Sequence, residues 1–396
     1  MKSRLLRLVV DKLLAAKVLL IVFLLVGCES ITYYGHVAKG QWQLLQARES
    51  IDELLADPNT DESLTKRLQS VQSMRSFATR ELLLADNNSY RDYVDLARPY
   101  VVWNVFAAEE FSVAPVEWCF PVAGCVSYRG YFDEAKAHIF ADSLAAQGYE
   151  SYVAGVSAYS TLGWFDDPVL STFLYRDDTQ LAGLIFHELA HQLLYVAGDT
   201  TFNESFATVV EQEGVRRWLA FQQQPASFIE HYYRRQQMQQ DFIATILDLR
   251  AKLDQLYHPT LPSEPLNTEL LTSEPLNSLN NPEPLNQTSL TQDARRRQKQ
   301  QLLAEYISGQ YQSFKTHWQT DRYDHWVESE LNNAKLATVA SYHQWLPAFQ
   351  QLLKQSDDLP AFYESAKKLS KLAPEPRQQA LQSLLNKYQQ LNLHSE

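Results

Sequence analysis

Glycine is scarce in this sequence, with 12 among 396 residues, and long stretches of strong helix formers occupy much of the chain. This combination favours helices. Apolar residues make up 45% of the chain, which is enough to bury a sizeable core in one large domain or two moderate ones. We therefore expect a mainly α protein, of the α+β type.

Blocks of basic residues are missing beyond residue 17, except for Arg295-Arg296-Arg297, and the net charge is -12. A protein that binds nucleic acid needs a basic face to meet the phosphates. Nucleic acid is therefore not an expected partner. The acidic balance alone does not choose between a role in solubility and a preference for basic substrates.

The apolar run at the N-terminus is too short to cross a membrane. It extends from Val18 to Val26, whereas a spanning helix needs about 20 apolar residues. A basic leader precedes it, and it ends in Leu25-Val26-Gly27-Cys28. The segment resembles a bacterial lipoprotein signal with its lipobox. The resemblance implies that residues 1–27 are removed and that Cys28 becomes the lipidated first residue. The alternative is a plain anchor helix from about Leu13 to Val26.

The lipoprotein resemblance also implies a location. The chain would be held to a membrane of the bacterial cell envelope through Cys28 and would face the periplasm. Glu29, rather than an aspartate, follows the cysteine, and by analogy with enterobacterial sorting this favours the outer membrane. The sequence leaves the oligomeric state open.

Two further cysteines, Cys119 and Cys125, are six positions apart, and Pro121 and Gly124 between them can turn the chain. In an oxidising periplasm, a disulfide across this short loop is the expected state. The alternative is a pair of separate buried thiols.

A first region, residues 28–257, is predicted to contain helices and a small sheet. Apolar residues recur at helical spacing through residues 40–110 and again through 178–250. Residues 101–106 differ, because they are rich in the β-branched and aromatic residues typical of a strand.

The small sheet is expected within residues 111–175, which are rich in aromatic and small residues. Strand-like pieces occur at 126–131 and 152–158, and residues 133–147 have the pattern of a helix that Gly148 ends. The sheet would therefore lie just before the next long helix.

A repeated tetrapeptide marks residues 258–296. Glu-Pro-Leu-Asn begins at Glu264, Glu274 and Glu283, among many Ser, Thr and Asn residues. Such a segment cannot bury enough apolar area to offset its ordering entropy. We predict a disordered insertion at the surface, after which helices in residues 297–396 complete the domain.

The motif that carries chemistry is His187-Glu188-Leu189-Ala190-His191. The apolar residues around it recur at helical spacing, Asp177 or Asp178 can cap the start of the helix, and Gly198 can end it. In a helix, His187 and His191 are one turn apart on one face, so both imidazoles can reach one tetrahedral zinc ion.

Glu188 lies beside the two histidines and can serve as the general base of a hydrolase. It would take a proton from a zinc-bound water whose pKa the metal lowers toward about 7. The alternative is a pair of partly buried histidines without a metal.

A third zinc ligand is expected from the next helix, which would run antiparallel from about Phe202 after a tight turn. Glu204 and Glu211 bracket the level of the histidines and share a face, whereas Glu213 faces elsewhere. Geometry alone leaves Glu204 and Glu211 open. Glu204 could instead form a capping box with Thr201.

A resemblance to gluzincins bears on this choice. Asn203-Glu204-Ser205-Phe206-Ala207 resembles the Asn-Glu-x-x-Ala element that carries their third ligand. The resemblance implies that Glu204 binds zinc and that Glu211 supports the site from outside the ligand shell. The gap of 12 residues between His191 and Glu204 is shorter than in the best-known gluzincins, a departure that concerns the packing of the two helices.

The chain also resembles a bacterial family of predicted periplasmic or lipoprotein aminopeptidases. The likeness lies in Tyr33-Tyr34-Gly35-His36 with Gly40-Gln41, in residues 119–132, in residues 158–165, and in Leu331-Asn332-Asn333-Ala334-Lys335-Leu336. It covers most of residues 28–375 but not the repeats. It implies zinc-dependent removal of N-terminal residues from peptides.

Other roles are less defined by the sequence. The oxyanion of the reaction needs a donor, and Tyr342, His343, Tyr159 and Tyr128 are candidates, of which Tyr342 is our choice. Residues 152–160 could hold a substrate backbone by strand addition or could be an ordinary core strand. Arg129 could pair with a substrate carboxylate or with a structural acid. The acid that would hold the substrate's ammonium group cannot be named.

The sequence thus predicts a zincin-like zinc peptidase that acts on peptides through His187, His191, Glu204 and Glu188, and the family resemblance implies an aminopeptidase. One alternative is a zinc endopeptidase or cell-wall peptide hydrolase with the same site. Another is a non-catalytic lipoprotein with a vestigial zinc site, or a structural four-ligand zinc site. Glu188 argues against these last two, because a structural site needs no general base.

Overall fold

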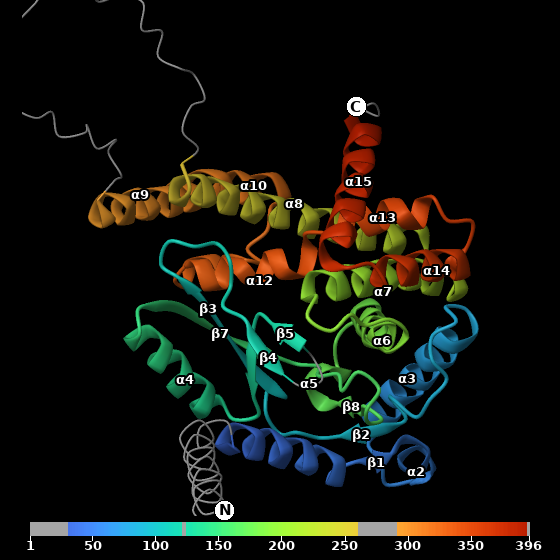
Figure 1. Cartoon of the computed structure of the whole chain (residues 1–396). Helices are drawn as coiled ribbons and strands as arrows, with labels where there is room; N and C mark the ends of the chain where they lie inside the picture. The colour runs from blue at the N-terminus through green and yellow to red at the C-terminus, as the bar shows by residue number, and fades with distance from the viewer. Residues whose placement is uncertain (1–30, 121–123, 260–290, 394–396) are drawn as a thin grey trace, which may run out of the picture.

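Helices make up most of the described chain, with three small sheets between them, so the predicted mainly α fold of α+β type is confirmed (Figure 1). The computed structural model describes residues 31–120, 124–259 and 291–393, with the backbone alone for 341–343 and 392–393. The predicted signal segment 1–27 and Cys28 lie outside the described residues. None of the described helices is both long and apolar enough to cross a membrane.

A helix over residues 31–46 precedes the numbered elements. The helices that follow are α2 (Ile51–Ala56), α3 (Glu62–Arg80), α4 (Glu134–Ala146), α5 (Ser171–Leu174), α6 (Asp178–Leu193), α7 (Thr200–Phe221), α8 (Ala226–Tyr257), α9 (Gln292–Glu305), the π-helix η1 (Tyr306–Tyr311), α10 (Gln312–Trp318), α11 (Asp324–Glu328), α12 (Asn333–His343), α13 (Leu346–Lys354), α14 (Leu359–Ser370) and α15 (Pro374–Leu393). The strands are β1 (Glu49–Ser50), β2 (Asp92–Val94), β3 (Val102–Glu109), β4 (Trp118–Phe120), β5 (Gly124–Val126), β6 (Arg129–Tyr131), β7 (Tyr149–Val156) and β8 (Val169–Leu170).

The largest sheet has the order β6-β3-β7 and is antiparallel throughout. Its middle strand β3 confirms the strand predicted at 101–106, and β7 confirms the one at 152–158. The strand predicted at 126–131 is divided into β5 and β6, which belong to different sheets. Helix α4 packs on this sheet, α12 contacts both β3 and β7, and α8 lies beyond α12 (Figure 1).

The helical spacing that extends through residues 40–110 predicts helix beyond Arg80, and this part of the prediction is wrong. Residues 81–101 form turns and the short strand β2. Buried Arg75 of α3 reaches into this segment and donates hydrogen bonds to the carbonyls of Ala85 (2.6 Å), Asn87 (3.1 Å) and Ser89 (3.1 Å). A buried side chain thus satisfies carbonyls that a helix would have paired internally.

The predicted insertion over residues 258–296 extends too far toward the C-terminus. Residues 260–290, which carry the three tetrapeptides, lie outside the described residues. Helix α9 nevertheless begins at Gln292, where Thr291 caps it by accepting a hydrogen bond from Ala294 N at 3.3 Å. The polar composition of residues 291–296 favours an insertion, but the N-cap residue and the helix formers after it stabilise a helix there.

The main core joins helices that are far apart in the sequence. On α7, Phe202 packs edge-on against Phe349 of α13 with ring centroids 5.0 Å apart, and Phe206 stacks on Phe362 of α14 at 5.7 Å. All four rings are fully buried, and each such ring contributes about 1.5–3 kcal/mol through burial. The C-terminal helices therefore fix α7 in place from the side away from the cavity described below.

The segment Leu331–Leu336 connects α12 to the main sheet through hydrogen bonds. Asn332 caps α12 by accepting a hydrogen bond from Lys335 N, and its amide donates to the carbonyl of Ser151 in β7. Buried Asn333 donates to the carbonyls of Glu109 (3.1 Å) and Glu110 (2.9 Å). These residues hold α12 across the end of β3 and β7.

The hairpin of β4 and β5 is closed by the predicted disulfide between Cys119 and Cys125. The hairpin lies against the turn that follows α6. Gly124 has a φ of +75°, and a Cβ added there would lie 2.4 Å from the backbone nitrogen of Gly198. This position therefore admits glycine alone without a shift of one backbone or the other.

Loss of this disulfide is expected to destabilise the protein by about 2 kcal/mol, the entropy of closing so short a loop in the unfolded chain. The double variant Cys119→Ala/Cys125→Ala should show a lower urea midpoint than the oxidised protein. Addition of a reductant should lower the midpoint of the natural protein to a similar degree and leave the variant unchanged. Equal midpoints for variant and oxidised protein would contradict the prediction.

Candidate metal centre

Helix α6 presents the His-Glu-x-x-His motif to the interior. Asp177 caps it, as one of two predicted candidates, and accepts a hydrogen bond from Gln180 N at 2.9 Å. Leu181, Ile185 and Leu189 are fully buried on one side of the helix. The helix ends at Leu193 and not at Gly198 as predicted. The backbone N–H and carbonyl of Val196 form hydrogen bonds with the side chain of Asn203 instead of continuing the helix.

The turn from α6 to α7 is held by Asn203. Its side chain accepts a hydrogen bond from Val196 N at 2.7 Å and donates one to Val196 O at 2.8 Å. Asp199 caps α7 by accepting from Phe202 N at 3.0 Å, so the capping box considered for Thr201 and Glu204 is not formed. The two hydrogen bonds of Asn203 and the Asp199 cap reverse the chain within a few residues, so that α7 runs back along α6. The short gap between His191 and Glu204 is thereby accommodated.

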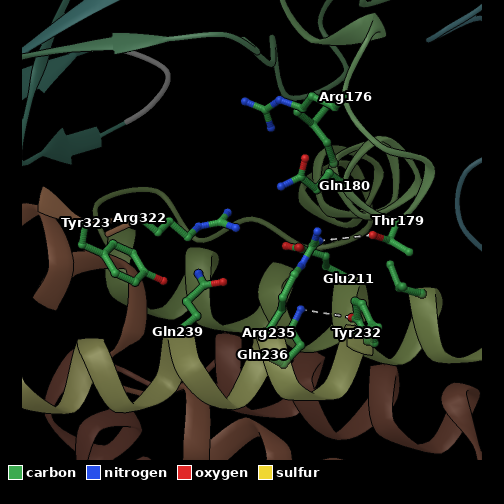
Figure 2. Close-up of a pocket in the computed structure, with 12 residues that line it drawn as sticks. Arg176, Thr179, Gln180, Glu211, Tyr232, Arg235, Gln236, Gln239, Arg322 and Tyr323 are labelled. Atoms are coloured by element: carbon green, nitrogen blue, oxygen red, sulfur yellow. Dashed lines mark hydrogen bonds between the residues drawn. The ribbon is translucent and has the colours of Figure 1, made fainter. Parts of the chain in front are cut away.

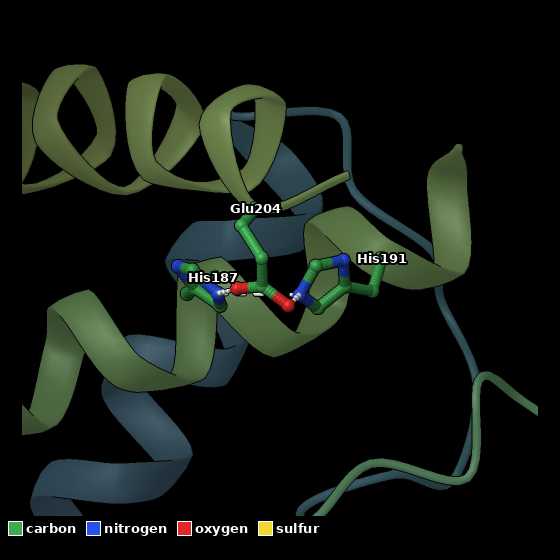
Figure 3. A group of neighbouring side chains, drawn as sticks. All are labelled: His187, His191 and Glu204. Atoms are coloured by element: carbon green, nitrogen blue, oxygen red, sulfur yellow. Dashed lines mark hydrogen bonds and ion pairs between the residues drawn. The ribbon is translucent and has the colours of Figure 1, made fainter. Parts of the chain in front are cut away.

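His187, His191 and Glu204 meet between the two helices (Figure 3). Their potential ligand atoms all lie within 4.8 Å of one another. The Nε2 atoms of the histidines are 3.2 Å apart, and the Glu204 carboxylate lies 3.2 Å from His187 Nε2 and 3.7 Å from His191 Nε2. Two imidazoles and one carboxylate directed at one point could hold a metal ion, and this donor set is one that zinc takes in catalytic sites.

Glu211 contacts the other side of His187. Its carboxylate lies 3.1 Å from His187 Nδ1, the ring nitrogen that points away from His191 and Glu204. A partner at this nitrogen fixes the tautomer and orientation of a ligating histidine. Of the two glutamates left open by sequence spacing, the structure brings Glu204 to the convergence point and Glu211 behind it.

The ionisation of the two histidines differs. Burial lowers the pKa of His191 to about 4, against the opposing charge of Glu204. Burial also disfavours protonated His187, but hydrogen bonds to Glu204 and Glu211 outweigh it and raise its pKa well above the ordinary value. A metal ligand must be neutral imidazole, so binding of an ion would release the proton of His187.

Glu188 lies beside the histidines on the wall of a cavity. Burial raises the pKa of Glu188 to about 7. The charge of His187 opposes this rise, and the charges of Glu204 and Asp167 add to it. A carboxyl group with such a pKa can exchange a proton with a reacting molecule near neutral pH.

The cavity has a volume of about 1090 Å³, and His187, Glu188, His191 and Glu204 form part of its wall. Most of the remainder is apolar or aromatic, contributed by the helix over 31–46, the disulfide hairpin and residues 156–165. Such a mainly apolar hollow with a few converging polar groups is typical of a ligand site. Large exposed side chains at its edge are Tyr34, Trp42, Trp164 and Phe165.

The helix over 31–46 is the part of this wall that sequence reasoning did not connect with the site. Gly40 allows the helix to approach closely, since a Cβ there would lie 2.3 Å from the ring of Phe132. Tyr33, Tyr34 and Trp42 of the helix line the cavity. The Tyr-Tyr-Gly-His segment was a recognisable signal, but its position over the metal centre depends on tertiary packing.

The oxyanion candidates have different outcomes. Tyr128 and Tyr159 line the cavity, as does Tyr195, which sequence reasoning missed although it follows His191 by four residues. The side chains of Tyr342 and His343, including that of our chosen candidate, lie outside what the structure describes. The guanidinium of Arg129 lies over the rings of Tyr33 and Phe140, with its Cζ 4.1 and 4.5 Å from the ring centroids, so its neighbours include aromatic rings, whereas the sequence suggested a carboxylate.

A family model matches most of the chain. Residues 32–273 and 276–381 match the model of a family described as "Putative aminopeptidase". The chain belongs to this aminopeptidase family. The matched ranges include most of the repeat segment, which the resemblance was expected to leave out. No curated protein and no solved structure matches the chain. Membership of the aminopeptidase family supports peptidase activity, and the histidine–glutamate cluster is compatible with a metal-dependent member.

Proposed function

We propose that the protein is a zinc-dependent aminopeptidase, held through lipidated Cys28 to a bacterial envelope membrane, favoured to be the outer one, and facing the periplasm. The observation that carries the catalytic part is the convergence of His187, His191 and Glu204 beside Glu188 on the wall of one cavity. The lipobox carries the localisation.

His187, His191 and Glu204 would hold the zinc ion. When bound, zinc supplies a Lewis acid that polarises the scissile carbonyl and lowers the pKa of water. Glu188 would accept a proton from the attacking water at its carboxylate and pass it to the leaving nitrogen. Glu211 would keep His187 oriented, and the apolar walls would exclude bulk water from the reacting atoms.

One observation favours an endopeptidase or a cell-wall peptide hydrolase as a second candidate. The carboxylates that line the cavity, among the described residues, are Glu188 and Glu204, and both already have roles. An aminopeptidase also needs an acceptor for the substrate's free ammonium group. Hydrolysis of amino-acid nitroanilides compared with N-blocked peptides tests the choice, since cleavage of blocked peptides alone would exclude the aminopeptidase.

Removal of the metal is expected to abolish hydrolysis and to lower the melting temperature. A ligand present at 100 times its dissociation constant stabilises a folded protein by about 2.7 kcal/mol. We would measure zinc per chain by mass spectrometry, then activity and melting before and after a chelator. One equivalent of zinc should restore both properties. Full activity in protein freed of metal would contradict the proposal.

Replacement of the oxyanion donor is expected to reduce kcat by about 10²–10³-fold. Tyr342→Phe, Tyr128→Phe, Tyr159→Phe and Tyr195→Phe remove only a hydroxyl each. Tyr128 is the strongest candidate among the described residues, because it lines the cavity and because desolvation and the charges of Glu204 and Glu188 raise the pKa of its phenol. Comparison of kcat among the four variants identifies the donor, and equal activity in all four would exclude a tyrosine donor from this set.

A further inference from the structure

A second, smaller cavity of about 260 Å³ lies beside the metal centre and carries a group of arginines (Figure 2). Arg176 comes from the turn before α6, Arg235 from α8 and Arg322 from the turn before α11. Gln180, Gln236 and Gln239 add amides to its lining. A hollow lined by guanidinium and amide groups from separate segments is suited to an anion.

The two cavities share faces of the same two helices. On α6, Gln180 and Leu184 line the small cavity, and His187 and His191 line the large one. Residues spaced by three or four positions lie on one face of a helix. On α7, Glu204 lines the large cavity and Glu211 the small one. The small cavity therefore lies about one to two helical turns from His187 toward the start of α6, with Glu211 and His187 at the boundary between the two cavities.

Two contacts join the cavities directly. Glu211 lies 3.1 Å from His187 Nδ1 and faces the small cavity. Arg176 Nη2 donates a 2.5 Å hydrogen bond to the hydroxyl of Ser157, which lines the large cavity at the end of β7. A ligand that passes His187 along β7 would thus reach Arg176 next.

The charges leave one cation in excess. Asp177 pairs with Arg235 at 3.0 Å, and the charge of Glu211 acts on Arg176 without a direct ion pair. The side chain of Arg322 is exposed and forms no hydrogen bond or ion pair with the described residues. The fork of its guanidinium matches a carboxylate. One net positive charge suits a single carboxylate better than a doubly charged phosphate.

The distance from the metal centre limits the length of the ligand. Leu184 and Gln180 precede His187 by three and seven positions, which is about 4.5 and 10.5 Å along the helix axis. An extended peptide covers about 3.3–3.6 Å per residue. A carboxylate in the small cavity would therefore lie about one to three residues from the scissile bond.

We propose that the cavity lined by Arg176, Arg235 and Arg322 binds the C-terminal carboxylate of a short peptide substrate, so that the enzyme acts on di- to tetrapeptides. This inference rests on the proposed peptidase function. It assigns the apolar cavity to the N-terminal part of the peptide and the arginine cavity to its C-terminal end.

The test measures binding and hydrolysis separately. Phe-Ala, Phe-Ala-Ala and Phe-Ala-Ala-Ala, each as free acid and as C-terminal amide, are titrated calorimetrically into zinc-loaded Glu188→Gln protein. We expect the acid of at least one length to bind about tenfold tighter than its amide. Arg322→Gln and the double variant Arg176→Gln/Arg322→Gln, made in the same background, should remove this preference. Arg234→Gln is the matched control, because Arg234 lies over the ring of Trp318 and does not line the cavity.

Each outcome decides the proposal. Equal binding of acids and amides, no binding of either, or a preference that survives both variants would overturn it. Tighter binding of acetate or inorganic phosphate than of the peptide acids would identify a site for free anions and would also overturn it. If the acid preference is present but the natural protein hydrolyses no peptide, the proposed function fails and the carboxylate site stands. If peptides are hydrolysed with equal KM for acid and amide, the reverse holds.

Discussion

Glu188→Gln is expected to reduce peptide hydrolysis by about 10²–10⁴-fold, the contribution of a general base, while the zinc content stays near one ion per chain. Glutamine has nearly the same shape but cannot accept a proton from water. Glu188 is not among the residues that converge on the candidate ion position, so its replacement leaves the three ligands in place. The loss should appear in kcat at a nearly constant KM.

Glu213→Gln is a suitable control. Glu213 lies on α7 but pairs with Arg216 and Arg217, each at 2.7 Å, away from the large cavity. Its replacement should leave zinc and activity nearly unchanged. Full activity in Glu188→Gln protein that still holds zinc would remove Glu188 from the mechanism. Zinc without hydrolysis in the natural protein would favour a binding lipoprotein over an enzyme.

The helix that carries the His-Glu-x-x-His motif could be predicted because its signals are local. The buried apolar positions and the spacing of His187 and His191 lie within α6, and the capping residue Asp177 directly precedes it. The family resemblance then narrowed the third ligand to Glu204, a choice that spacing alone had left open.

The segment after Arg80 could not be predicted in the same way, because contacts distant in sequence determine it. Asn87 donates a 2.6 Å hydrogen bond to Gln192 of α6, and Gln192 in turn donates to Ser89. Tyr90 N donates to the carbonyl of Asp167 at 2.6 Å. Helical periodicity is outweighed by these partners, which sequence reasoning does not see. The segment consequently supports the helix that carries the histidines.

The two cavities depend even more on tertiary packing. The helix over 31–46 approaches the candidate metal centre closely because Gly40 has no Cβ to meet the ring of Phe132. Arg176, Arg235 and Arg322 are separated by more than fifty positions in each interval and form one lining through the packing of α6 and α8. Single arginines of this kind carry no signal of a shared site in the sequence.

The two glutamates that face His187 are expected to differ sharply in their effect on zinc affinity. Nε2 and Nδ1 of one imidazole point in different directions, so an ion held at His187 Nε2 is accessible to Glu204 and not to Glu211. Glu211→Gln should weaken zinc binding by about 10–100-fold, as loss of an outer partner does. Glu204→Gln removes a ligand and should weaken it further. Competition with a chromophoric chelator measures both constants, with Glu213→Gln as the control, and the reverse order of effects would make Glu211 the ligand.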